Sequence, residues 1–272
     1  MDERELAIDG LKVFVREAEP PSGATPVLYV HGVPTNSDDW LPFLERTGGI
    51  ALDLPGFGRS DKPSDFDYSL AGYGSFLEAF RARLGLERYS LVAHDWGAVG
   101  LMLAQAAPER VERLVISNTV PLVPGYRWHR IARVWRTPLA GELMMGLSTR
   151  WGFKLLSRES TSAEGPAPDD LTERVWRHFD HGTQRAILKL YRSAPPAVLA
   201  EAGRDLGALR CPALVLWGAD DPYIPSSFAQ AHADALGGPA QVEVLEGANH
   251  WPWIDRPDAL DTVTGFLLGA SH

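Results

Sequence analysis

Short apolar runs recur along the chain, and helical stretches separate several of them. Each run has the length and composition of a strand that is buried on both faces. Strands that alternate with helices or long loops are typical of a mostly parallel sheet with helices on both faces, so we predict an α/β fold. The runs that we interpret as strands lie at residues 26–30, 49–52, 89–92, 111–117, 213–217 and 240–245.

The first residues follow a different pattern. Residues 5–16 alternate around an Asp-Gly pair at 9–10, which predicts a β-hairpin. The first long helix is predicted at residues 69–84, because Ser69 suits an N-cap and Gly85 suits a helix end. Further helices are predicted at residues 99–106, 226–235 and 257–268.

The alternation stops between residues 121 and 208. This segment has helical spacing, four tryptophans, a predicted loop at 164–168 and no clear strand. Its net charge is +4 while the remainder of the chain carries −13, which favours pairing between the two parts. We therefore predict a core domain formed by residues 1–120 and 209–272, with residues 121–208 as an inserted helical cap.

Composition excludes several classes of protein. The 272 residues are 45% hydrophobic and 22% charged, as in a soluble globular protein, and the net charge of −9 argues against nucleic acid as a partner. No apolar run approaches the length of a membrane span, and the charged first residues do not resemble a signal peptide. Cys211 is the single cysteine, and no Cys/His cluster has the spacing of a metal site. We expect a cytoplasmic monomer or homodimer that acts on a small molecule without a metal or cofactor and without a membrane partner.

The segment Ala93-His94-Asp95-Trp96-Gly97-Ala98 joins the strand at 89–92 to the helix at 99–106. A reactive side chain on a sharp strand-to-helix turn, with a small residue two positions before and after it, is the pattern of a nucleophile elbow. Asp95 occupies the central position, where a serine is usual. The alternative interpretation is that Asp95 only caps the helix, since Asp is favoured at helix starts.

An aspartate at this position changes the expected chemistry. A carboxylate is already ionised at neutral pH, so it can displace a leaving group from a saturated carbon and become an ester. Water must then cleave that ester at the carboxyl carbon of Asp95. The elbow therefore predicts a general base and an oxyanion hole elsewhere in the chain.

Several motifs together resemble the α/β-hydrolases, and within them the branch of epoxide hydrolases and haloalkane dehalogenases. The resemblance covers nearly the whole chain outside residues 121–208. The motifs, in chain order, are His31-Gly32-Val33-Pro34, Asp53-Leu54-Pro55-Gly56-Phe57-Gly58-Arg59-Ser60, Ala93-His94-Asp95-Trp96-Gly97-Ala98, Gly218-Ala219-Asp220-Asp221-Pro222 and Gly247-Ala248-Asn249-His250-Trp251-Pro252.

The resemblance implies partners for Asp95. His250 follows the last strand and is expected to be the general base, because the nucleophile, acid and histidine follow one another in this order in the fold. The acid that orients it is expected at Asp221, with Asp220 as the alternative. The oxyanion hole is expected to consist of the backbone N–H groups of Val33 and Trp96.

The resemblance does not decide whether the leaving group is a halide or the oxygen of an epoxide. The indole of Trp96 could solvate a halide, as in dehalogenases, but Val33 stands where these enzymes commonly have an asparagine as second donor. Tyr191 matches a ring-opening tyrosine of epoxide hydrolases, whereas Tyr126 is a poor match to its usual partner. His31 is also assigned to substrate or leaving-group binding. The cap tryptophans that could replace the missing donor are Trp128, Trp135, Trp151 and Trp176.

Three functions are therefore compared. The sequence slightly favours an epoxide hydrolase, because Tyr191 offers a proton to an opening epoxide. A haloalkane dehalogenase is the first alternative. A ligand-binding protein with this fold and no catalysis is the second, although the complete set of Asp95, Asp221 and His250 argues against it.

Overall fold

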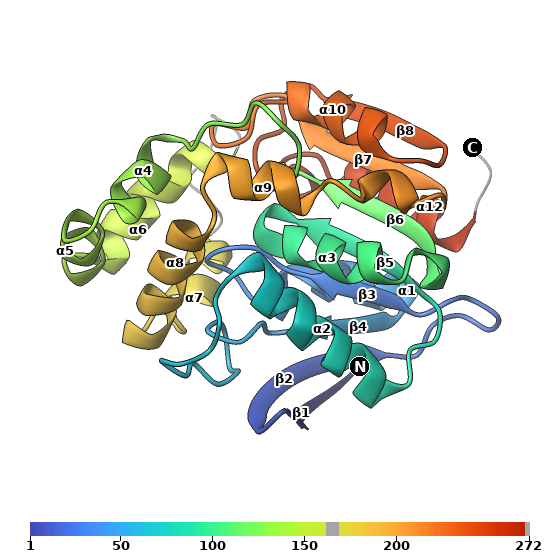
Figure 1. Cartoon of the computed structure of the whole chain (residues 1–272), viewed down its shortest axis with the longest axis horizontal. Helices are drawn as coiled ribbons and strands as arrows, with labels where there is room; N and C mark the ends of the chain where they lie inside the picture. The colour runs from blue at the N-terminus through green and yellow to red at the C-terminus, as the bar shows by residue number, and fades with distance from the viewer. Residues whose placement is uncertain (162–168, 270–272) are drawn as a thin grey trace.

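A sheet of eight strands is the centre of the computed structural model, which describes residues 1–161 and 169–269 (Figure 1). The strand order is β1-β2-β4-β3-β5-β6-β7-β8. The first three strands in this order pair antiparallel, and every later pair is parallel. The strands are β1 (Asp2–Ile8), β2 (Leu11–Ala18), β3 (Val27–Val30), β4 (Gly49–Leu52), β5 (Tyr89–His94), β6 (Val111–Ser117), β7 (Ala213–Gly218) and β8 (Ala240–Leu245).

The two faces of the sheet are buried in separate cores. Along β3, Leu28 and Val30 contribute to one hydrophobic cluster, and Val27 and Tyr29 contribute to the other. Neighbouring side chains of a strand point to opposite faces, so a strand covered on both sides must be apolar throughout. Burial of both faces of the sheet therefore explains the continuous apolar runs of the sequence, and the predicted α/β fold is confirmed.

Helices cover both faces. The first cluster contains side chains of α2 (Leu70–Leu84), α3 (Val99–Ala106) and α10 (Ser227–Ala235). The second contains side chains of α1 (Leu41–Thr47) and α12 (Asp258–Leu268), with the short α11 (Pro252–Asp255) beside them. Helix α2 begins after Ser69, whose side chain accepts the N–H of Gly72, and ends at Gly85, which has a φ of 65°. Both predicted ends of this helix are thus confirmed.

Residues 121–208 contain helices and no strand in the part that the structure describes. Figure 1 shows α4 to α8 together at one end of the sheet, whereas α9 lies beside α3. We refer to α4–α8 as the cap helices. The predicted loop at 164–168 lies outside the described residues. The helices are α4 (Arg130–Arg136), α5 (Ala140–Gly146), α6 (Arg150–Ser157), α7 (Asp169–Trp176), α8 (His181–Ser193) and α9 (Pro196–Ala202).

Polar contacts join the cap helices to loops of the sheet. Lys62 binds Asp180 over 2.7 Å, and Thr183 donates to the carbonyl oxygen of Gly56 over 3.0 Å. These contacts hold α8 against the loop that follows β4. Among the described residues, no helix is both long and apolar enough to span a membrane.

Candidate active site

Asp95 lies at the end of β5, in the tight turn that leads into α3. Its φ of 49° falls in the left-handed region, which is rare for a residue other than glycine. The turn brings backbones very close together: a Cβ at Gly97 would clash with the carbonyl oxygen of Val30, and one at Gly32 would clash with the Asp95 side chain. These contacts explain the small residues around Asp95.

The Asp95 carboxylate is held by a loop from another strand. Its Oδ2 accepts the backbone N–H of Val33 over 2.7 Å, and the N–H of Trp96 also stabilises the charged form. Its Oδ1 lies 3.7 Å from Nε2 of His250, too far for a hydrogen bond. His94, not Asp95, occupies the N-cap position of the turn. The position of Asp95 is therefore that of a fixed carboxylate with one free oxygen, not that of a helix cap.

His250 contacts a second buried carboxylate. Its Nδ1 lies 2.8 Å from Oδ2 of Asp221. The other carboxylate oxygen, Oδ1, accepts the backbone N–H groups of Tyr223 and Ile224 over 2.8 and 3.1 Å. Because Asp221 accepts at Nδ1, the neutral imidazole presents an unprotonated Nε2 toward Asp95.

Asp220 occupies a different environment. It is exposed, and its backbone N–H donates to the carbonyl oxygen of Ala248. The structure thus brings Asp221, and not Asp220, to His250.

Burial and neighbouring charges set the protonation of Asp95, Asp221 and His250. Burial raises the pKa of Asp95 to about 6, opposed by the charge of His250 and by the N–H groups of Val33 and Trp96. Burial acts in the same direction on Asp221, but the charge of His250 and the hydrogen bonds from His250 and Asn118 bring its pKa below the usual value. Burial lowers the pKa of His250, yet the charge of Asp221 and its hydrogen bond outweigh this effect and raise it.

The strand order explains why these residues meet. β3 lies between β4 and β5, so the order of the parallel strands reverses there, and such reversals form crevices at the carboxyl ends of the strands. Val33 follows β3 and Asp95 follows β5 at this point. Asn118, Asp221 and His250 follow β6, β7 and β8 at the same edge of the sheet.

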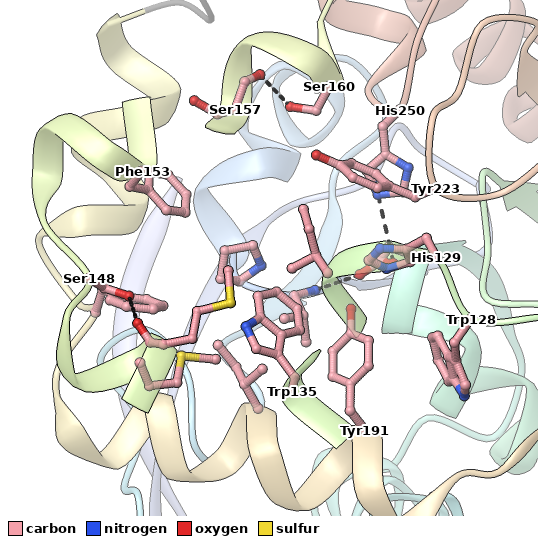
Figure 2. A pocket seen from close by; sticks show the side chains of 18 of the residues that line it. Trp128, His129, Trp135, Ser148, Phe153, Ser157, Ser160, Tyr191, Tyr223 and His250 are labelled. Carbon is pink, nitrogen blue, oxygen red and sulfur yellow. Dashed lines mark hydrogen bonds and ion pairs between the residues drawn. The ribbon is translucent and has the colours of Figure 1, made fainter. Parts of the chain in front are cut away.

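A cavity of about 420 Å³ lies between Asp95 and the cap helices. Its wall is mainly apolar and includes Trp135, Ile187 and Phe153, together with Asp95 and His250. Figure 2 shows Tyr191, Tyr223 and His250 around one part of this space, and Phe153 and Ser148 at the other. A carboxylate at the base of an apolar cavity can attack a substrate from which water is largely excluded.

Tyr191 lines the cavity and separates it from Trp96. The ring of Trp96 is fully buried and packs edge to face against Tyr191, with ring centroids 5.0 Å apart. Burial and the charge of Asp95 raise the pKa of the Tyr191 phenol well above its usual value, and the nearby indole N–H of Trp96 opposes this effect. Tyr191 also packs edge to face against Trp135, at 4.9 Å.

The other predicted donors are placed differently. The indole of Trp128 donates to the carbonyl oxygen of Ala194 over 3.0 Å, so it is not available to a ligand. In the described part of the chain, neither Trp151, which is 74% exposed, nor Trp176 lines the cavity. Trp135 does line it, and its Nε1 has no partner among the described residues. Tyr126 also lines the cavity, and its hydroxyl donates to the carbonyl oxygen of Tyr223 over 3.4 Å.

The assignment of His31 to substrate or leaving-group binding is wrong. His31 is fully buried, and its Nε2 accepts the backbone N–H of Leu54 over 2.9 Å. Its Nδ1 donates to the carbonyl oxygen of Gly32 over 2.8 Å. With both ring nitrogens bound to backbone, His31 fixes the loop that carries Val33 and has no group left for a ligand.

Sequence reasoning missed two residues of the site. Asn118 donates from Nδ2 to Oδ2 of Asp221 over 2.6 Å. His129 was not considered, although it lines the cavity at the start of α4. The position of Asn118 directly after a predicted strand was the available signal for it. No group of three or more His, Cys, Asp or Glu side chains in the described ranges could hold a metal ion.

Comparisons with known proteins agree with this geometry. Residues 25–257 match the family model of the alpha/beta hydrolase fold. A haloalkane dehalogenase of Mycolicibacterium paratuberculosis is 31% identical over 258 residues, which cover 88% of this chain and 81% of the relative. The crystal structure of the haloalkane dehalogenase DbeA from Bradyrhizobium elkani has a TM-score of 0.83, with 26% identity and 98% of both chains covered. That of DbjA also has a TM-score of 0.83 and 26% identity, covering 98% of this chain and 97% of DbjA. The chain therefore belongs to the α/β-hydrolases, in the branch of epoxide hydrolases and haloalkane dehalogenases, and is a hydrolase.

Proposed function

We propose that this hydrolase cleaves carbon–halogen bonds through an ester formed on Asp95. The observation that carries the proposal is that the two carboxylate oxygens of Asp95 differ in their hydrogen bonds. Oδ2 accepts the N–H of Val33 over 2.7 Å. Oδ1 lies 3.7 Å from Nε2 of His250 and has no hydrogen bond to it.

In the first step, Oδ1 attacks the carbon that carries the halogen. A C–O bond forms, the carbon–halogen bond breaks, and the halogen leaves as a halide ion with the bonding electron pair. The N–H of Val33 keeps Oδ2 in place, so that Oδ1 is the oxygen available for attack, and the N–H of Trp96 stabilises the charged carboxylate.

In the second step, water attacks Cγ of the ester while Nε2 of His250 takes its proton. Negative charge develops on Oδ2, where the N–H of Val33 already lies at hydrogen-bond distance. Asp221 stabilises the imidazolium of His250. The alcohol then leaves with the proton from His250. Asp95 is regenerated as a carboxylic acid, which ionises and releases the second proton of the water to solvent, so each cycle yields an alcohol, a halide ion and a proton.

The leaving halide would be received near the Tyr191 hydroxyl. The indole of Trp135, which lines the cavity, packs edge to face against this phenol, and its Nε1 has no partner among the described residues. N–H and O–H donors without acceptors suit an anion that needs solvation and no proton. This arrangement would replace the donor that is missing at Val33.

The comparisons support the halide interpretation more than the epoxide interpretation that the sequence slightly favoured. Two of the similar proteins named above are described as haloalkane dehalogenases, one at 31% identity and the other at a TM-score of 0.83. Their described activity belongs to those proteins, and we extend it to this chain as a proposal.

Epoxide hydrolysis is the second candidate, and Tyr191 is the observation that favours it. Its phenol lines the cavity close enough to Asp95 for the carboxylate to raise its pKa, after the larger effect of burial. A phenol can protonate the alkoxide that forms when an epoxide opens.

The test is a panel of 1-bromoalkanes, 1-chloroalkanes and terminal epoxides with the purified protein, followed by halide and diol release. We expect halide release that disappears in the variant Asp95→Asn. Diol release without halide release would replace the first candidate by the second. A substrate that raises the melting temperature without any turnover would favour the non-catalytic interpretation.

A further inference from the structure

His129 lies in the cavity wall and has no role in the steps above. It precedes α4, and its ring centroid lies 4.9 Å from that of Tyr223 and 6.4 Å from that of Tyr191. The ring of Tyr223 packs against those of both His129 and His250, and Figure 2 shows these residues and Tyr191 around the same part of the cavity. His129 is thus an imidazole close to the proposed site of reaction.

The contact of His129 with α4 defines its tautomer. The backbone N–H of Ala132 donates to Nδ1 over 3.4 Å, which makes His129 the N-cap of this helix. A nitrogen that accepts a hydrogen bond carries no proton, so the neutral ring has its proton on Nε2. Burial lowers the pKa of His129 to about 4, aided by the charge of His250, so the ring is neutral over the physiological range.

The Nε2–H donor has no partner in the part of the chain that the structure describes. Besides Tyr191 and Trp135, which are assigned above to the leaving group, three hydroxyl groups of the cavity wall already donate to the protein itself. Ser148 donates to the carbonyl of Met144, Ser160 to that of Ser157, and the Tyr223 hydroxyl to Glu159. His129 is therefore a free neutral donor in a mainly apolar wall.

We infer that His129 is a specificity-determining residue that binds an oxygen of the substrate. The Nε2–H would donate to an ether, hydroxyl or carbonyl oxygen located a short chain away from the carbon that Asp95 attacks. The substrate class is thus a haloalkane with a hydrogen-bond acceptor, rather than a plain hydrocarbon chain. The part of this inference that concerns the reacting carbon rests on the proposed function. The part that concerns binding of a substrate oxygen by His129 does not depend on it.

The experiment compares two substrates of the same shape, 2-bromoethyl ethyl ether and 1-bromopentane, in which an ether oxygen replaces a methylene group. We expect the protein to prefer the ether in kcat/KM, and we expect the variant His129→Ser to reduce that preference about five- to tenfold, as for the loss of one hydrogen bond. Serine is itself a good N-cap, so α4 should keep its start and the melting temperature should stay close to that of the original protein. The matched control is Ser148→Ala, which removes a cavity-wall hydroxyl that is already engaged and should leave the preference unchanged.

A binding measurement separates the two proposals. Tetrahydropyran and cyclohexane have the same shape and no leaving group, and their binding can be followed by quenching of tryptophan fluorescence. We expect tighter binding of tetrahydropyran, and loss of that difference in His129→Ser. If no halide is released but this difference is found, the proposed function fails and the role of His129 stands. An equal preference in the original protein and in His129→Ser, in both measurements, overturns the inference about His129.

Discussion

The side-chain amide of Asn118 donates to Oδ2 of Asp221 over 2.6 Å, the same oxygen that faces Nδ1 of His250. Asn118 also accepts the backbone N–H of Gly218 through Oδ1, over 3.1 Å. It thereby joins the loop after β6 to the end of β7 and orients the carboxylate between them. The backbone of Asn118 adopts the left-handed conformation, with a φ of 42°.

We expect the variant Asn118→Gly to slow hydrolysis of the ester. Glycine accepts the positive φ, so the variant removes the amide without adding backbone strain. Loss of one hydrogen bond to a charged group should lower the rate of this step by roughly tenfold. Rapid-quench kinetics should show an unchanged rate of halide release in the first turnover and a slower steady state. Equal slowing of both phases would contradict this role.

Replacement of Asp221 should affect turnover much more than replacement of the neighbouring Asp220. Asp221→Asn removes the partner of Nδ1 of His250, so we expect turnover to fall by about 10²-fold or more. Asp220→Asn is the matched control, since Asp220 is exposed, and its turnover should stay within about twofold of the original protein. The measurement is kcat for both variants with one substrate. Comparable losses in the two variants would move the role of the acid away from Asp221.

The variant His250→Gln should trap the ester. The variant keeps Asp95 and the N–H of Val33 but has no base for water, so the first step proceeds and the second stops. Intact-mass spectrometry after incubation with substrate should show one added alkyl group, located on Asp95 by peptide mapping. The double variant with Asp95→Asn should show none. Absence of the adduct in His250→Gln, with a substrate that the original protein turns over, argues against an ester intermediate.

Acid should stop the first step. The nucleophile must be ionised, and burial raises the pKa of Asp95 to about 6, so the rate of ester formation should fall as the pH falls through that value. The charge of His250 lowers the pKa of Asp95, so the midpoint should move to higher pH in His250→Gln. The measurement is the first-turnover rate of adduct formation between about pH 3 and 8. A midpoint near 4 in the original protein, the usual range for an aspartate, would contradict the effect of burial.

Tyr191 distinguishes the two leaving groups. An alkoxide is a strong base that needs a proton, so Tyr191→Phe should slow ester formation from an epoxide by about 10²-fold. A halide needs only solvation, and the indole of Trp135 remains in the cavity wall, so ester formation from a bromoalkane should fall by less than about tenfold. The two rates are measured with the same preparation. Equal losses would indicate that Tyr191 supports the site structurally.

The sequence by itself predicted which segments form the strands and which residue is the candidate nucleophile. Strands buried on both faces must be continuously apolar, so the runs at 89–92 and 111–117 could be predicted as strands of a mostly parallel sheet. The flanking small residues marked Asp95, because close backbone contacts at a tight turn leave no room for larger side chains. Helix α2 was predictable at both ends since capping depends on neighbours in the chain.

Only the tertiary structure decided which side chains meet. Asp220 and Asp221 are adjacent in sequence, and the path of the loop after β7 buries one and exposes the other. His31 stands in a motif beside Val33, yet backbone groups of two loops bind both of its nitrogens. Asn118 and Asp221 are 103 positions apart, and His129 reaches the cavity because α4 begins there. Contacts between distant segments depend on how the loops leave the sheet, and local sequence patterns carry little information about that.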